Sequence, residues 1–406
     1  MNQVQGRDGI ARAADAPGIR RAPLPPVLDY AFRPMFLAAG SWAMIALALW
    51  LGMFFGYAGL RSRFDPAAWH VHEMLFGFVM AAVAGFLLTA IPNWTGRLPA
   101  RGLRLAALAG FWLLGRLASL VSADMPAWLA IVADLAFPTA LLAIAAREII
   151  AGRSWRNLPI TAPLALFIVA DLLMHLEALG MALPAGLGWR LAVTAPLLLI
   201  SVIGGRIIPS FTRNWLSRRN GARLPSPQNA LDGAAVGVLA ATLILWAFLP
   251  EHRVIGALLI VAALLNAVRL TRWRGAATWA EKLLFILHVG YSWLVLGVLL
   301  LGLSIFDIVP LASAVHALTA GAIAVMILAV MPRVTLGHTG RELTANRATV
   351  VVFALINVAA IARICASWST EAATILLLSA GLCWIAAFGL FELVYGPMLL
   401  TRRPAS

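Results

Sequence analysis

Two histidines and a glutamate open a strongly apolar stretch of this chain. His70, His72 and Glu73 lie in the first turn of segment 69–96, which is long and apolar enough to form a membrane-spanning helix. An ionisable side chain inside a membrane costs about 3 kcal/mol on insertion scales, so such groups mainly persist where they face a bundle interior and have a function. Imidazole is a common metal ligand, and a carboxylate often orients it. We therefore predict that this segment carries the functional site.

The depth of the other histidines in their apolar segments suggests partners. Four of the seven could share the outer half of a helix bundle: His70, His72, His175 and His316. His288 lies near the inner third of its segment, His338 in the loop LGHTGREL and His252 in an outer loop. For each histidine within a span, a role as a hydrogen-bonded packing residue remains the alternative to a role as a ligand.

Helical spacing limits which of these groups can act together. Residues two apart on an α-helix diverge by about 200°, so His70 and His72 cannot easily bind one metal and their helix offers one axial ligand. Asp171 and His175 have i, i+4 spacing, which would let the carboxylate orient the ring. Arg116 and Asp134 lie at matching depths in consecutive, antiparallel segments, and we predict a structural ion pair between them.

Composition identifies the class of protein. Of 406 residues, 62% are hydrophobic and 12% are charged, and the mean hydropathy is +0.90, so the chain is a multi-spanning membrane protein. The net charge is +14, and the basic residues lie between the apolar runs. This placement is explained by the orientation of the chain in the membrane and does not indicate a nucleic-acid partner. Two cysteines in separate apolar segments predict no disulfide framework.

Twelve apolar runs are long enough to cross a bilayer, and they predict an all-α fold with both termini on one side. The runs begin near Pro34, Trp69, Gly102, Pro126, Leu158, Gly188, Asp232, Arg253, Ala280, Pro310, Arg347 and Glu371. With the N-terminus inside, inner segments hold 24 of the 31 basic residues. The positive-inside rule then predicts cytoplasmic termini, with residues 1–33 as a cytoplasmic tail and 34–401 as a single transmembrane domain.

A short motif suggests internal repetition. Pro-x-x-Thr closes the second, sixth and tenth apolar runs at Pro92, Pro209 and Pro332, which are 117 and 123 residues apart. This spacing predicts three pseudo-repeats of four helices each, at about 34–150, 158–270 and 280–400. The common twelve-span transporters are instead built from two groups of six.

The motifs WHVHEMLFGF, GFLLTAIPNWTGR, RIIPSFTRNW, LHVGYSWL and HALTAGAIAVMILAVMPRVTLGHTGREL resemble those of the NnrS family across essentially the whole chain. This resemblance implies a bacterial inner-membrane protein that carries haem, of b type, and copper. It also implies a role in nitric oxide metabolism and resistance to nitrosative stress, often in denitrifying bacteria.

A more distant resemblance is to the catalytic subunits of haem-copper oxidases. They also have twelve spans in three groups of four, and a histidine of the second span and one of the tenth hold a low-spin haem. The matching positions here are His72 and His316. Segment 188–248 has no histidine, so the three-histidine copper centre of that family cannot form there, and an oxidase or reductase activity of that type is not implied.

Copper needs other ligands in this chain. His70, His175, His288 and His338 are the available nitrogens, and imidazole suits copper. Four further polar groups are expected to support the sites: Glu73, Asp171, Arg206 and Tyr291. Expected partners are the lipid bilayer, nitric oxide or a related small ligand, and an unidentified electron donor. Two other functions remain open, a membrane transporter and a metal- or cofactor-handling assembly factor that uses the same histidines.

Overall fold

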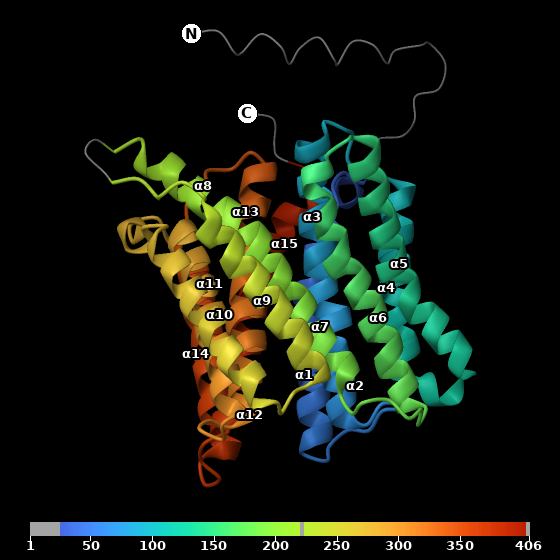
Figure 1. The fold of residues 1–406 in the computed structure, drawn as a ribbon. Helices are drawn as coiled ribbons and strands as arrows, with labels where there is room; N and C mark the ends of the chain where they lie inside the picture. Colours follow the sequence, from blue (N-terminus) through green and yellow to red (C-terminus); the bar gives the residue numbers. More distant parts are fainter. Residues whose placement is uncertain (1–24, 220–222, 403–406) are drawn as a thin grey trace, which may run out of the picture.

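The computed structural model describes residues 25–219 and 223–402, and within these ranges it is helical without strands. Of the cytoplasmic tail predicted at 1–33, residues 1–24 lie outside the described part. Twelve helical segments are long and apolar enough to span a membrane, which confirms the predicted all-α fold with twelve spans. Figure 1 shows them as long, roughly aligned helices joined by short loops.

Nine spans are single helices or a helix with a short 3₁₀ start. They are α1 (Phe32–Phe54), α4 (Leu103–Leu120), α5 (Ala127–Ala151), α6 (Thr161–Ala178), α9 (Ala230–Phe248), α10 (Arg253–Thr271), α11 (Lys282–Ser304), α14 (Arg347–Cys365) and α15 (Ala373–Leu400). The 3₁₀ turn η4 (Trp155–Ile160) leads into α6. The turn η1 (Pro26–Leu28) precedes the first span, and η3 (Ser122–Asp124) and η6 (Gly275–Thr278) lie between spans.

The second, sixth and tenth spans each contain a π-helical segment. They are α2 (Pro66–His72), η2 (Glu73–Val79) and α3 (Met80–Thr95); α7 (Leu187–Leu199), η5 (Ile200–Gly204) and α8 (Gly205–Leu216); and α12 (Leu311–His316), η7 (Ala317–Ile323) and α13 (Ala324–His338). In their most apolar stretches 78%, 78% and 72% of residues are buried, against at most 61% in the other described spans. These three spans therefore form the centre of the bundle.

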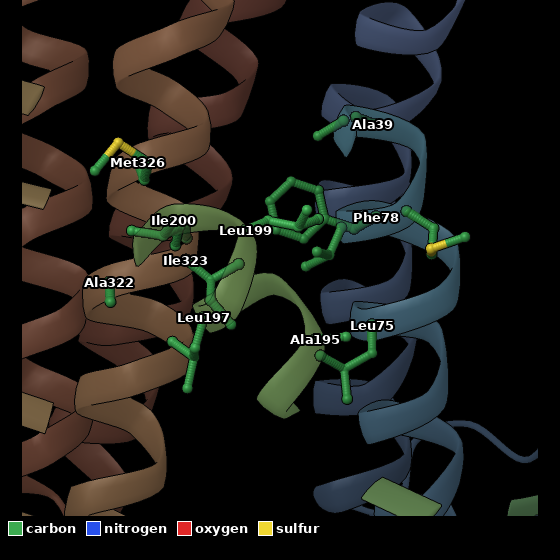
Figure 2. Packing of buried hydrophobic residues seen from close by; sticks show 14 of the residues in the cluster. Ala39, Leu75, Phe78, Ala195, Leu197, Leu199, Ile200, Ala322, Ile323 and Met326 are labelled. Carbon is green, nitrogen blue, oxygen red and sulfur yellow. The ribbon is translucent and has the colours of Figure 1, made fainter. Parts of the chain in front are cut away.

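Apolar side chains hold the central spans together. Leu75 and Phe78 of the second span, Leu199 of the sixth and Ile323 of the tenth lie in one cluster of buried residues (Figure 2). The outer spans instead leave large apolar side chains exposed, such as Leu382 at 66%. This distribution fits a bundle whose outer surface contacts lipid.

The three Pro-x-x-Thr motifs have the same local structure. Each proline lies inside a helix that continues beyond it. The hydroxyls of Thr95, Thr212 and Thr335 each donate to the carbonyl four residues earlier, at 2.9, 2.8 and 2.8 Å. The division of the chain into three pseudo-repeats of four helices stays a prediction.

The first and last spans meet at one end of the bundle. Nη1 of Arg33, near the start of α1, donates to the carbonyls of Leu399 and Thr401 at 2.8 and 2.9 Å. These carbonyls lie at the C-terminus of α15, where a helix has unpaired acceptors and a negative partial charge. A chain with an even number of spans has its first and last spans ending on the same side of the membrane. Which side that is remains a prediction.

Candidate functional site

An apolar cavity of about 280 Å³ lies among the first, second, sixth, tenth and last two spans. Two histidines line it, His70 from α2 and His316 from the end of α12. Its walls include the indole rings of Trp50, Trp189 and Trp384. Its walls have the apolar character of a small-molecule or cofactor site, in which a few polar groups fix the orientation of the ligand, and its volume lies just below the usual range of about 300 to 1,000 Å³.

His70 is packed without hydrogen bonds to its Nδ1. The imidazole stacks on Trp50, with ring centroids 4.3 Å apart and an interplanar angle of 26°. Its Nδ1 is buried and has no hydrogen-bond partner among the described residues. Since an unpaired polar atom in an apolar site costs about 1 to 3 kcal/mol, this ring is held for a reason other than local hydrogen bonding.

His316 has a defined tautomer when neutral. Its Nδ1 lies 2.7 Å from the carbonyl oxygen of Ala312, one turn earlier on the same helix. A carbonyl only accepts, so Nδ1 must carry the proton and Nε2 of the neutral ring has the lone pair. This arrangement leaves Nε2 available as a metal ligand.

One cationic side chain of the described residues also lines the cavity. Arg363, from the last turn of α14, lines it together with the two histidines. Nη1 of Arg363 donates to Ser367 Oγ at 3.1 Å. The sequence analysis does not predict Arg363 as a site residue. Its position in the span, close to the end at which His316 lies, was the signal that could have placed it in the site.

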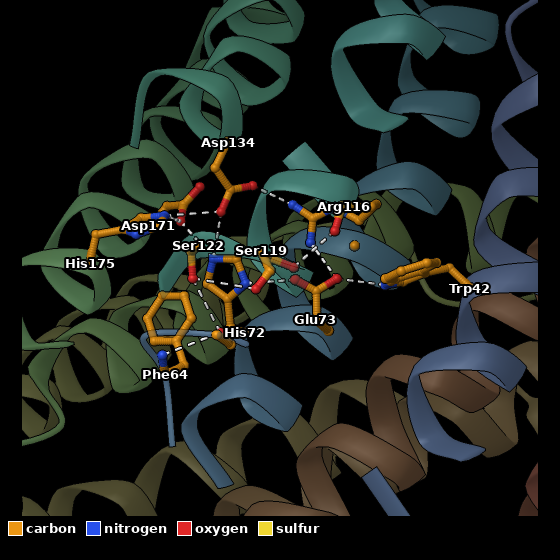
Figure 3. A network of polar contacts seen from close by, with 12 residues as sticks. Trp42, Phe64, His72, Glu73, Arg116, Ser119, Ser122, Asp134, Asp171 and His175 are labelled. Carbon is orange, nitrogen blue, oxygen red and sulfur yellow. Dashed lines mark hydrogen bonds and ion pairs between the residues drawn. The ribbon is translucent and has the colours of Figure 1, made fainter. Parts of the chain in front are cut away.

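The side chain of His72 does not line this cavity. It lies in a buried polar cluster, which Figure 3 shows. Its Nδ1 lies 3.0 Å from Glu73 Oε1. Its Nε2 lies 2.9 Å from Asp134 Oδ2 and 3.0 Å from Asp171 Oδ1. Both ring nitrogens therefore face carboxylates, and neither is directed at the cavity that His316 lines.

His175 completes the cluster. Its Nε2 lies 3.0 Å from Asp134 Oδ2 and 3.7 Å from Asp171 Oδ1. The contact with Asp171 is the predicted i, i+4 interaction, although Asp134 is the closer partner. Four spans thus contribute to one group, because His72, Asp134, Asp171 and His175 come from α2, α5 and α6, and Arg116 from α4 approaches from the side.

Arg116 connects the cluster to a second carboxylate. Its guanidinium contacts Asp134, as the matched depths predict, and donates through Nη1 to Glu73 Oε2 at 2.7 Å. Trp42 Nε1 donates to the same Glu73 oxygen at 2.7 Å. The sequence pattern did not predict Trp42 or the Glu73 contact, because both depend on how α1 and α4 rotate against the second span.

The remaining predicted residues lie apart from both groups. His288 places Nδ1 3.1 Å from the Leu284 carbonyl and Nε2 3.2 Å from Thr212 Oγ1. His338 lies against Tyr30 and Phe32. The four histidines considered for copper therefore have four different surroundings, and of them only His175 lies in a group of potential metal ligands within the described chain.

The two other supporting residues have ordinary polar partners. Arg206 donates to Asn157 Oδ1 at 3.1 Å. The Tyr291 hydroxyl accepts from Arg269 at 2.8 Å and donates to Asn266 at 2.7 Å. Neither residue lines the cavity or belongs to the His72 cluster.

Comparisons with known proteins place the chain in a family. A search of curated proteins gives no match. A family profile described as NnrS protein matches residues 26–403, which is nearly the whole chain. It spans all twelve membrane helices, both lining histidines of the cavity and every residue of the buried cluster. The chain therefore belongs to the NnrS protein family.

Proposed function

We propose that this protein binds a haem in the cavity lined by His70 and His316, and that it acts in the response to nitric oxide and nitrosative stress. The observation that carries the proposal is the presence of two imidazoles, from two different central spans, on the walls of one apolar cavity. The pair predicted from the sequence is revised in one position, with His70 in place of His72, because both nitrogens of His72 face carboxylates.

The donor set fits a haem of b type. His70 has a buried Nδ1 without a partner, and the tautomer of His316 leaves Nε2 free for iron. The tryptophan rings supply flat apolar surfaces, and Arg363 supplies a cation for a haem propionate. Bound there, the haem would supply redox chemistry or a site for a diatomic ligand, and two protein ligands favour electron transfer.

A neighbouring cavity supports a small uncharged ligand. It has a volume of about 90 Å³, its walls are almost entirely apolar, and Val79 and Ile323 line both cavities. Nitric oxide is small and uncharged, so apolar walls do not hinder it as they would hinder an ion. These apolar walls favour a gas or redox function over the transport of a charged solute.

The cellular setting follows from the sequence. We propose a location in the bacterial inner membrane, as the resemblance to the NnrS family implies. We also propose cytoplasmic termini, because basic residues concentrate in the segments assigned to the inside. We also keep copper as a candidate metal, because imidazole suits it. An oxidoreductase activity at this haem would require an electron donor.

An optical spectrum of the purified, full-length protein tests the proposal. We expect a Soret band, one haem per chain by pyridine haemochromogen assay, and a shift of the reduced spectrum when nitric oxide is added. A colourless protein with a full complement of folded helices would contradict the proposal and favour a transporter or an assembly factor.

A further inference from the structure

We infer that His72, Asp134, Asp171 and His175 form a second site, independent of the haem, for one divalent first-row transition-metal ion. The four ligand atoms are two imidazole Nε2 and two carboxylate oxygens, and all lie within 4.8 Å of one another. All four residues are at most 6% exposed. The inference does not depend on the proposed function, since none of the four residues lines the haem cavity.

The distances fit a metal centre. Nitrogen and oxygen alternate around the group, and the four neighbouring N···O distances are 2.9, 3.0, 3.0 and 3.7 Å. In a tetrahedral site with bonds of about 2.0 to 2.1 Å, neighbouring ligand atoms are about 3.3 to 3.4 Å apart. The observed values lie on both sides of this distance, so small adjustments would place an ion between the four atoms.

Glu73 prepares His72 for such a role. Oε2 of the Glu73 carboxylate accepts hydrogen bonds from Arg116 and Trp42 Nε1, and its Oε1 accepts one from Nδ1 of His72 at 3.0 Å. The lone pair of the neutral ring is then on Nε2, which faces Asp134 and Asp171. A histidine that donates its other N–H to a carboxylate is the usual arrangement around protein-bound metals.

The charges of the cluster call for a divalent cation. Glu73, Asp134 and Asp171 carry three negative charges, and Arg116 supplies one positive charge to the group. Buried charges need to be neutralised, and a divalent ion balances the remaining two while both imidazoles stay neutral. Two protonated imidazoles would reach the same total, so the metal content decides between these states.

An unpaired oxygen provides an independent indication. Asp171 is 0% exposed, and its Oδ2 has no hydrogen-bond partner within the described chain. A second carboxylate oxygen without a donor is costly in an apolar interior. Bidentate binding of an ion by Asp171 would satisfy it.

The donor set limits the ion. Imidazole combined with carboxylate suits Zn²⁺, Mn²⁺, Fe²⁺ and Cu²⁺, whereas Cu⁺ prefers sulfur ligands, and none of the four donors is sulfur. Phe64 stacks on the His72 ring at 4.6 Å, and Phe76 lies at 4.9 Å. These rings cover the cluster with apolar surface, which favours a tightly held, structural or redox-tuning ion over a freely exchanging one.

Metal analysis of the full-length protein tests the inference. We expect about one equivalent per chain of one such ion by mass spectrometry, after subtraction of the haem iron measured as pyridine haemochromogen. Asp171→Asn and His175→Gln should each lower this content at least tenfold, and Glu73→Gln should weaken binding about tenfold. His288→Gln is the matched control, because it removes a buried imidazole outside the cluster, and it should leave the metal content unchanged.

A second measurement guards against misfolded variants. Chelator-treated wild-type protein is titrated with Mn²⁺, and the free ion is followed by electron paramagnetic resonance. One Mn²⁺ should bind per chain in wild type and His288→Gln, and none in Asp171→Asn that still elutes as a single species. A wild-type protein that contains no divalent ion beyond haem iron and takes up no Mn²⁺, or an unchanged content in both cluster variants, would overturn the inference.

Discussion

His70 and His72 differ by two positions and belong to different sites. At 3.6 residues per turn their side chains point in nearly opposite directions. His70 lines the cavity with His316, and His72 lies in the cluster with Asp134 and Asp171. A single turn of the second span thus joins the proposed haem site to the proposed metal site.

Arg116 gives the first prediction at the scale of single residues. Arg116→Met should destabilise the protein by about 3 to 5 kcal/mol, because two buried carboxylates would lose their shared cation. Thermal unfolding in detergent measures the effect. Arg206→Met is the control, since Arg206 donates to the neutral amide of Asn157. Equal losses of stability in the two variants would show that the ion pairs of Arg116 contribute nothing specific.

Depth along the spans explains which of these contacts could be predicted. The Arg116–Asp134 contact follows from matching positions in two consecutive spans. The choice between His70 and His72 depends on helix rotation, which depth does not specify. It also depends on carboxylates from α5 and α6 that become neighbours only in the folded bundle.

At the scale of helices, the π-helical segments adjoin the sites. η2 begins directly after His72 and η7 directly after His316. A π-helical segment inside an α-helix shifts the side chains that follow, and such segments often occur at functional sites. The apolar pattern predicted the twelve spans, but it could not predict these segments, because the central spans are apolar on nearly all sides and carry no periodic signal.

Close approach of α4 and α5 gives the second prediction. A Cβ on Gly115 would lie 2.8 Å from Asp134 Oδ1 and 3.2 Å from Asp134 Cα, and the backbone cannot easily move away. Gly115→Ala should therefore destabilise the protein by about 1 to 3 kcal/mol and lower its metal content. Thermal unfolding and metal analysis measure the two effects.

Gly237 in α9 provides the matched control. No atom lies within 4 Å of a Cβ added there, so Gly237→Ala should leave stability unchanged or raise it slightly, since alanine has the higher helix propensity. If both alanine variants unfold at the wild-type temperature, α4 and α5 are not as closely packed as described.

At the scale of the whole molecule, the charge distribution predicts the orientation in the membrane. Reporter fusions after Arg101 and Arg219 should remain in the cytoplasm, and those after Arg63 and Arg253 should be exported, because basic residues concentrate in the segments assigned to the inside. Alkaline phosphatase and β-galactosidase activities measure the two locations. The opposite pattern at any two positions would contradict this orientation.

The haem spectrum of four single variants tests the central claim most directly. His70→Ala and His316→Ala should each abolish or strongly shift the Soret band of the purified protein, because each removes one proposed ligand from the cavity. His252→Ala and His288→Gln should retain the wild-type spectrum, since neither residue lines that cavity. Normal haem content and an unchanged spectrum in both His70→Ala and His316→Ala would contradict the account.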